Sequence, residues 1–151
     1  MKLRAAVVMS AAPGGIFSLL RRHIRLGFGR FGDGRQMMSW IHERDFVRAV
    51  EWLIEHDEVE GVVNLAAPNP VSNEEFTRVL RQAMGKHIAI PSSGWILRFG
   101  AWMMRTEPEL VLKSRNVVPG RLIERGFRFE FPRWTDAARD LCTEVPAERT
   151  W

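Results

Sequence analysis

Short apolar runs alternate along this chain with segments whose apolar residues recur every three or four positions, and this alternation restricts the possible folds. Three runs have the length and composition of strands: residues 5–9, 37–41 and 62–66. Each precedes a segment with helical spacing: residues 16–24, 42–56 and 72–83. Strands that alternate with helices predict an α/β fold with a largely parallel sheet.

Local signals define several ends of these elements. Ser72 and Glu75, three residues apart, form a capping-box pattern that predicts the start of the third helix. Asp45 lies near the start of the second helix, where a carboxylate accepts backbone N–H groups, and we favour this role over a catalytic one. The glycines at 27, 29, 32 and 34, with phenylalanines between them, are predicted to end the first helix.

The pattern changes after Pro91, where helical spacing dominates. Helices are predicted at residues 95–104, 108–114, 119–125 and 135–141. Phe127, Phe129 and Phe131 alternate with charged residues, which predicts a strand. We therefore expect two parts, an α/β part over residues 1–88 and a small, mainly helical subdomain over residues 89–151.

Composition narrows the class of protein. Hydrophobic residues make up 46% of the 151 residues and charged residues 26%, the balance of a folded globular protein. Cys142 is the single cysteine, so neither an internal disulfide nor a cysteine zinc site is expected. The four histidines lack metal-ligand spacing, so no metal is expected. No apolar run approaches about 20 residues, so we expect a cytoplasmic protein without a membrane partner.

The net charge of +4 is concentrated in the first 50 residues. Two interpretations are open: a solvated basic face, which we favour, or a surface that meets the phosphates of a ligand. Nucleic acid is not expected as a partner, because no nucleic-acid-binding motif accompanies the charge. The basic residues concerned are Arg21, Arg22, Arg25, Arg30 and Arg35.

Three ordered blocks give the sequence a family resemblance. The blocks are Ser39-Trp40-Ile41-His42-x-x-Asp45, then Asn64-Leu65-Ala66-Ala67-Pro68-Asn69-Pro70-Val71-x-Asn73-x-x-Phe76, then Leu112-x-Ser114-x-x-Val117-x-Pro119-x-Arg121-Leu122-x-x-x-Gly126-Phe127-x-Phe129-x-x-Pro132. Together they resemble the atypical extended short-chain dehydrogenases/reductases known as epimerase-family proteins, which carry a C-terminal domain of unknown function. The resemblance implies the C-terminal half of such a protein: the late strands of a Rossmann-like parallel sheet plus a small helical subdomain.

The resemblance also implies a chemistry. It suggests a small-molecule substrate similar to a nucleotide sugar, bound beside NAD(P), with hydride transfer as the reaction type. It places five residues on the substrate side: Ser39, Trp40, His42, Asn64 and Asn69. We add Arg35 to this set from the basic residues that could meet the phosphates of a ligand. Structural roles remain open for several of them, because a histidine at a helix start or an asparagine at a strand end also serves as an anchor.

The residues that would carry this chemistry are absent from the chain. Pro13-Gly14-Gly15 lacks the glycine spacing of a pyrophosphate cradle and is interpreted as a strand-to-helix turn. The usual catalytic base of this superfamily is a tyrosine four residues before a lysine, and this sequence contains no tyrosine. We therefore name no catalytic residue and expect no tight NAD(P) binding by this chain alone.

Two functions remain open at this point. The chain is either the substrate-side half of a split or truncated epimerase or oxidoreductase, or a non-catalytic interaction module. In the second case it self-associates or pairs with a separately encoded N-terminal half. A homo-oligomer is expected, because the strand at 5–9 would otherwise present an unpaired edge.

Overall fold

The computed structural model describes residues 1–86, 90–92 and 114–144. The predicted helix at 95–104 lies outside the described residues, as does all but the last residue of the predicted helix at 108–114. The strands are β1 (Lys2–Ala5), β2 (Val7–Met9), β3 (Phe28–Phe31), β4 (Met37–Met38), β5 (Trp40–His42), β6 (Val62–Leu65), β7 (Val71–Ser72) and β8 (Ile90–Ser92). The helices are α1 (Ile16–Arg25), α2 (Glu43–Glu55), α3 (Asn73–Ala83), α6 (Gly120–Glu124) and α7 (Trp134–Glu144).

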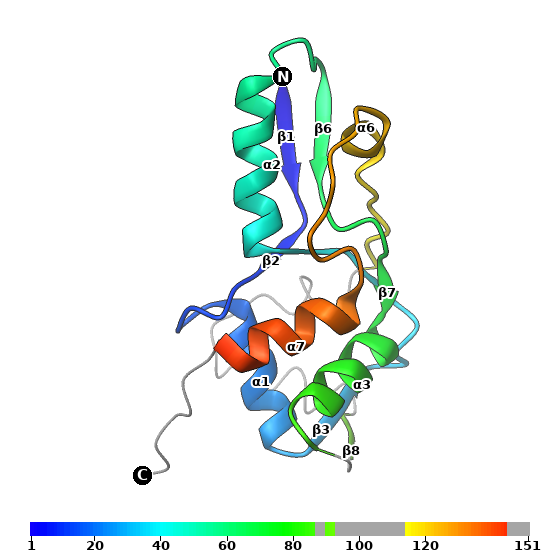
Figure 1. Cartoon of the computed structure of the whole chain (residues 1–151). Helices are drawn as coiled ribbons and strands as arrows, with labels where there is room; N and C mark the ends of the chain where they lie inside the picture. Colours follow the sequence, from blue (N-terminus) through cyan, green and yellow to red (C-terminus); the bar gives the residue numbers. More distant parts are fainter. Residues whose placement is uncertain (87–89, 93–113, 145–151) are drawn as a thin grey trace.

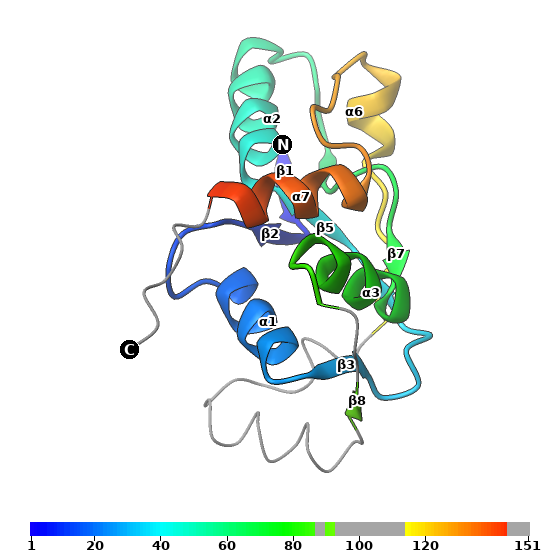
Figure 2. The ribbon, with the colours of Figure 1, turned by 60° about the horizontal axis from the view of Figure 1, so that its bottom comes forward.

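The strands pair mostly in parallel, as the sequence predicts for an α/β fold. β1 pairs with β6, β2 with β5 and β3 with β8 in parallel, whereas the short β4 and β7 pair antiparallel. In Figure 1, α2 and α6 flank the β1–β6 pair, and α1, α3 and α7 gather at the other end of the molecule with β3. Figure 2 shows the same grouping from a second side.

The predicted strand at 5–9 is divided at Ala6. The Ala6 N–H still donates to the Leu65 carbonyl at 2.9 Å, but the next residues pair with β5 instead of β6. β5 fits into this divergence, because the Ala67 N–H donates to the Trp40 carbonyl at 2.7 Å. A parallel strand inside a Rossmann sheet is buried on both faces, but this run is not: Ala5 is exposed, residues 6–8 are half-buried, and only Met9 is fully buried.

Two further features differ from the sequence pattern. The glycine-rich stretch after α1 contains a strand that was not predicted, β3, because its backbone finds a parallel partner in β8. Residues 127–131, predicted as a strand, form none. Their backbone donors meet a side chain in place of a neighbouring strand, since the Asp45 carboxylate accepts the N–H groups of Glu130 and Phe131, each at 2.8 Å.

The helix starts agree with the sequence. Ser72 precedes α3, and its hydroxyl accepts the Glu75 N–H at 3.2 Å, which satisfies a donor left free by helix geometry. His42 precedes α2, and its Nδ1 accepts the Arg44 N–H at 3.1 Å. Both caps lie directly after a strand, so they fix the points at which the chain leaves the sheet.

The buried apolar residues form two clusters. The first surrounds Trp40, Phe76 and Trp134 and joins α1, α3 and α7. The second surrounds Val63, Leu65 and Leu122 and joins β6 with α2 and α6. Residues from both sides of position 88 contribute to each cluster, so the two parts expected from the sequence share their cores. No described helix combines the length and apolar character needed to cross a membrane.

Candidate functional site

The six predicted substrate-side residues divide by exposure. Ser39, Trp40 and His42 are buried, with exposed fractions of 5%, 0% and 0%. Asn64 is half-buried, and Asn69 and Arg35 are exposed. A small molecule that approaches from solvent therefore meets the second set first.

Ser39 and Trp40 bond to protein groups far along the chain. The Ser39 hydroxyl donates to the Arg115 carbonyl at 2.7 Å and accepts the Val117 N–H at 2.8 Å. The Trp40 indole N–H donates to the Asn69 carbonyl at 3.3 Å, and its ring meets Trp134 edge-on at 5.1 Å. These bonds attach residues 115–117 and the turn after β6 to β5.

His42 is enclosed between α2 and α7. Its Nε2 lies 3.2 Å from a carboxylate oxygen of Asp140 without the alignment of a hydrogen bond, and its ring stacks on Phe131 at 4.0 Å. Because Nδ1 accepts a backbone N–H, the neutral ring carries its proton on Nε2. Burial lowers the pKa of His42, and this outweighs the opposing effect of Asp140. The imidazole is thus held neutral as a helix cap.

Asp45 links the start of α2 to residues 130–131. Its side chain is 1% exposed and accepts three hydrogen bonds at 2.8 Å, two from the backbone and one from Arg48 Nη1. The sequence predicted a carboxylate in the first turn of a helix, and the structure confirms that position. Its bonds to Glu130 and Phe131 could not be predicted from the sequence, because the alternating pattern of residues 127–131 predicted a strand.

Asn64 and Asn69 each hold a distant carbonyl. Asn64 Nδ2 donates to Val118 O at 3.4 Å, and Asn69 Nδ2 donates to Pro132 O at 2.9 Å. Both amides therefore anchor the segment between Ser114 and α7 against the strand ends. Asn69 remains exposed beside this bond.

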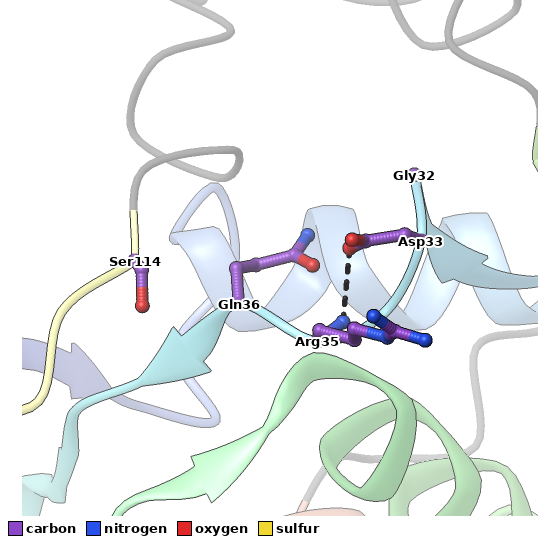
Figure 3. Close-up of a pocket in the computed structure, with 5 residues that line it drawn as sticks. All are labelled: Gly32, Asp33, Arg35, Gln36 and Ser114. Atoms are coloured by element: carbon purple, nitrogen blue, oxygen red, sulfur yellow. Dashed lines mark hydrogen bonds between the residues drawn. The ribbon is translucent and has the colours of Figure 1, made fainter.

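Arg35 lines an open hollow of about 420 Å³ together with Gly32, Asp33, Gln36 and Ser114. In Figure 3 the side chains of Asp33 and Gln36 point toward one another, Arg35 extends beneath Asp33, and Ser114 stands on the opposite side. The Asp33 carboxylate accepts the Arg35 N–H at 3.0 Å, which shapes the loop. The hollow thus combines a guanidinium, a carboxylate and neutral polar groups.

The Gln36 amide and the Ser114 hydroxyl, the neutral polar groups of this hollow, differ in how many of their hydrogen bonds are formed. Gln36 Nε2 donates to the Phe31 carbonyl at 2.9 Å, which identifies Oε1 as the amide oxygen, and Oε1 is buried without a hydrogen bond. The Ser114 hydroxyl accepts the Met37 N–H at 3.1 Å and keeps its own proton for a further acceptor. Sequence reasoning identified Arg35 and missed Asp33 and Gln36, which belong to no motif. Ser114 belonged to the third block of the family resemblance but was given no role.

The start of α3 positions this loop. The Asn73 N–H donates to Gln36 O at 2.9 Å, and its side-chain oxygen accepts the Phe31 N–H at 2.8 Å. Gly34 has φ +77°, and a Cβ there would lie 2.8 Å from Arg30 Cδ and 3.1 Å from Glu74 Cβ. A side chain at position 34 would therefore disturb the loop both sterically and conformationally.

The loop that leads into the Pro13-Gly14-Gly15 turn contacts a carboxylate. The Ser10 hydroxyl donates to Glu43 Oε2 at 2.5 Å, and the Ala11 N–H donates to Glu43 Oε1 at 3.1 Å. A pyrophosphate needs free backbone N–H groups and positive potential at such a loop. The residues of this loop do not fit the pyrophosphate of a dinucleotide, because Glu43 already takes the Ala11 N–H and adds a negative charge just before the turn.

The predicted basic residues do not share one environment. Arg22 and Arg25 are exposed on α1, Arg21 on the same helix is buried, and Arg30 lies 3.3 Å from Glu74. Only Arg35 lines the hollow in Figure 3. In the described part of the chain, no three His, Cys, Asp or Glu side chains converge in a way that could hold a metal ion.

Comparison with known proteins finds similar sequences and a similar solved structure. Over 92% of its length the chain is 32% identical to the mouse epimerase family protein SDR39U1, and it covers 47% of that relative. Over 83% of its length it is 36% identical to the epimerase family protein Mb2239 of Mycobacterium bovis, of which it covers 41%. The crystal structure of human epimerase family protein SDR39U1 (isoform 2) with NADPH superimposes with a TM-score of 0.83 at 28% identity, over 94% of this chain and 48% of that one.

The sequence and the structure are thus similar to those of epimerase family proteins, which are atypical extended short-chain dehydrogenases/reductases. The chain spans about half the length of the curated epimerase-family relatives it matches. The structural likeness is to the C-terminal region of SDR39U1, whose fold is Rossmann-like. The family model named Domain of unknown function (DUF1731) matches residues 93–141, which include α6 and most of α7.

A second epimerase structure extends the likeness. The nucleoside-diphosphate sugar epimerase of Corynebacterium glutamicum matches 97% of this chain and 27% of its own, with a TM-score of 0.68 at 28% identity. The predicted resemblance and the predicted α/β class are therefore confirmed. NAD(P) is associated with the epimerase family through neighbours solved with NADPH or NAD.

Proposed function

We propose that this chain forms the substrate-side part of an NAD(P)-dependent nucleotide-sugar epimerase or oxidoreductase and is catalytically incomplete by itself. The observation that carries the proposal is the hollow lined by Arg35, Asp33, Gln36 and Ser114. A nucleotide sugar combines phosphate anions with many hydroxyl groups. The hollow offers a guanidinium for an anion, and acceptor oxygens on Asp33 and Gln36 for hydroxyl donors.

The other predicted residues support the hollow from behind in this proposal. Ser39 and Trp40 hold residues 115–117 and the turn after β6, and Ser114 lies at the start of the first of these segments. His42 and Asn69 fix the segment that leads into α7. Binding by Ser39, Trp40 or His42 directly would require them to leave these bonds, so we assign first contact with the substrate to Arg35.

In this proposal the Pro13-Gly14-Gly15 turn does not bind the cofactor, and other residues hold it. The loop that leads into this turn does not fit a pyrophosphate, and the sequence has no tyrosine for the usual base. The sheet supports the same division. The N–H groups of Lys2 and Ala6 bond toward β6, so by alternation those of Leu3 and Ala5 face the opposite edge.

That opposite edge of β1 is where a cofactor-binding half would add its strand. A parallel strand in a Rossmann sheet normally has neighbours on both edges and helices on both faces. Among the described residues β1 pairs only with β6. A strand supplied by a cofactor-binding half, whether part of a longer chain or separately encoded, would complete the sheet.

A titration with two ligands tests the proposal. For the isolated chain, we expect NADPH and NADH to bind no tighter than about millimolar, which corresponds to about 4 kcal/mol. A nucleoside-diphosphate sugar added to the ¹⁵N-labelled chain should shift the amide signals of residues 32–36 and 114. Arg35→Gln should weaken this binding, whereas Arg125→Gln, an exposed arginine of α6's end, serves as the matched control. Micromolar NADPH binding, or unchanged affinity in Arg35→Gln, would contradict the proposal.

The second candidate function rests on the β1 edge alone. In it the chain is a non-catalytic module that pairs with another copy of itself. β1 is exposed along its whole length, and Leu3 and Val62 keep 44% and 37% of their surface in solvent. Such an edge is a template for strand addition. Co-expression with the N-terminal half of a family relative separates the two functions: capture of that half with gain of NADPH binding favours the enzyme.

A further inference from the structure

Arg21 is a buried charge for which the described residues provide no counter-charge. It lies on α1 with 9% of its surface exposed, and its Nε is buried with no hydrogen-bond partner. No hydrogen bond or ion pair joins Arg21 to any residue that the structure describes. A buried guanidinium normally has a carboxylate or carbonyl partner, because burial of an unpaired charge costs several kcal/mol even after relaxation.

The comparison with Asp45 shows how unusual this is in the molecule. Arg21 and Asp45 are the two buried residues of the described chain that carry a full charge at neutral pH. Asp45 has three hydrogen bonds, including one from a cation. Among the same residues Arg21 has neither a hydrogen-bond acceptor nor an ion-pair partner, so one of these two buried charges is paired and the other is not.

The charged neighbours of Arg21 on its own helix are basic. Arg22, His23 and Arg25 lie on α1, and the first turn of that helix contains no acidic residue. Across the core, Cys142 on α7 interacts electrostatically with Arg21. Burial raises the pKa of the Cys142 thiol, so the thiol stays neutral at pH 7 and supplies no negative charge. An anion is therefore the group that would complete this site.

We propose that Arg21 binds a small oxyanion of the phosphate or sulfate class between α1 and α7. The guanidinium fork matches the oxygens of such an anion in a two-point geometry that a halide lacks. The slight exposure of the residue favours a small free anion over a carboxylate on a partner's surface, which would need the helices to separate. The site is distinct from the hollow at Arg35, because Arg21 does not line it.

Thermal unfolding of the full chain provides the first test, with phosphate replacing chloride at constant ionic strength so that general screening is unchanged. Inorganic phosphate should raise Tm in a saturable way, by roughly 4–8 °C at about thirty times its Kd. Arg21→Met should lose this rise and should be at least as stable as the native chain in chloride. Arg22→Gln, an exposed neighbour on α1, should keep the rise.

An Arg35→Gln variant separates this proposal from the proposed function. If Arg35→Gln keeps the phosphate-dependent rise and Arg21→Met loses it, the anion binds at Arg21 whatever the fate of the substrate hollow. If Arg35→Gln removes the rise, the anion binds in the hollow and the Arg21 proposal is overturned. Absence of any phosphate-specific rise in the native chain overturns it as well.

A direct binding measurement covers the case in which Arg21→Met does not fold. Phosphate ³¹P line broadening should titrate with the native chain, and Arg21→Lys should weaken the affinity about tenfold because an ammonium lacks the fork. Arg22→Lys is the matched control and should bind as the native chain does. Equal affinity in Arg21→Lys and the native chain would contradict a guanidinium site.

Discussion

The α1–α3–α7 cluster and the β1–β6 pair differ in how far each covers its own apolar surface. In the first, Trp40, Phe76 and Trp134 are at most 2% exposed and contact one another through stacked and edge-on rings. In the second, β1 is exposed throughout, and Leu3 keeps 44% of its surface in solvent. The helical cluster is thus covered by residues of this chain, whereas the described residues leave β1 uncovered.

This difference agrees with the proposed division of labour. The hollow at Arg35 is held by the start of α3, on the side of the satisfied cluster. The side that lacks partners is the one on which a Rossmann sheet would continue toward its cofactor. A substrate wall must be rigid to orient its ligand, and the aromatic cluster supplies that rigidity without help from another chain.

The largest effect is expected from truncation of the aromatic cluster. Trp134 stacks on Phe76 at 4.0 Å and donates its indole N–H to the Phe76 carbonyl at 2.9 Å. Trp134→Ala should lower the free energy of unfolding by about 3–5 kcal/mol through lost burial and a cavity. Urea unfolding measures it, with Leu3→Ala on β1 as the control, expected to cost less than about 1 kcal/mol. Equal costs would remove the contrast between the two regions.

A smaller loss of stability is expected from a change at Asp45, which links the start of α2 to the segment that leads into α7. Asp45→Asn keeps the shape of the side chain but removes the charge that accepts two backbone N–H groups and Arg48. We expect a loss of about 2–3 kcal/mol, because bonds to a charged acceptor are lost or weakened in a buried place. Arg48→Gln should cost no more than about 1 kcal/mol, since its partner-facing end is 42% exposed. A similar loss in both variants would show that the ion pair, not the backbone bonds, matters.

The sequence predicted the parts of the fold that depend on local pattern. The helix starts at His42 and Ser72 follow from residues within one turn, so periodicity and capping were sufficient. β3 and the irregular segment at 127–131 were missed, because each depends on a partner distant in sequence. In the hollow, Arg35 was found through the basic stretch of the first 50 residues, whereas the loop that holds Gln36 is positioned by α3, which a linear pattern does not show.

The pH dependence of stability should sharpen the role of His42, which joins the two regions. Burial lowers the pKa of His42 from its ordinary value of 6.5, so the unfolded chain takes up a proton that the folded chain refuses. Stability is therefore full above about pH 6.5 and falls as the pH drops from there toward the lowered value, by up to about 1.4 kcal/mol per pH unit.

The matched variant is His42→Asn, since asparagine keeps an acceptor for the helix cap and does not titrate. It should reduce the slope of unfolding free energy between about pH 6.5 and 5. The double variant with His23→Asn should reduce it further, because burial also lowers the pKa of His23. A native slope that survives in His42→Asn would show that the imidazole titrates freely in the folded chain.

The smallest effect on stability, and the most informative for assembly, is expected from proline at the open edge of β1. Ala5→Pro removes an N–H group that faces away from β6, so no bond within the chain is lost and stability should change by less than about 1 kcal/mol. Ala6→Pro, one residue later, removes the bond to the Leu65 carbonyl and should cost clearly more. If the β1 edge pairs with a second copy or with a cofactor-binding half, Ala5→Pro should abolish that association while the chain stays folded. Light scattering over a concentration series and pull-down of a relative's N-terminal half measure the two cases, and association that persists in Ala5→Pro would place the contact elsewhere on the molecule.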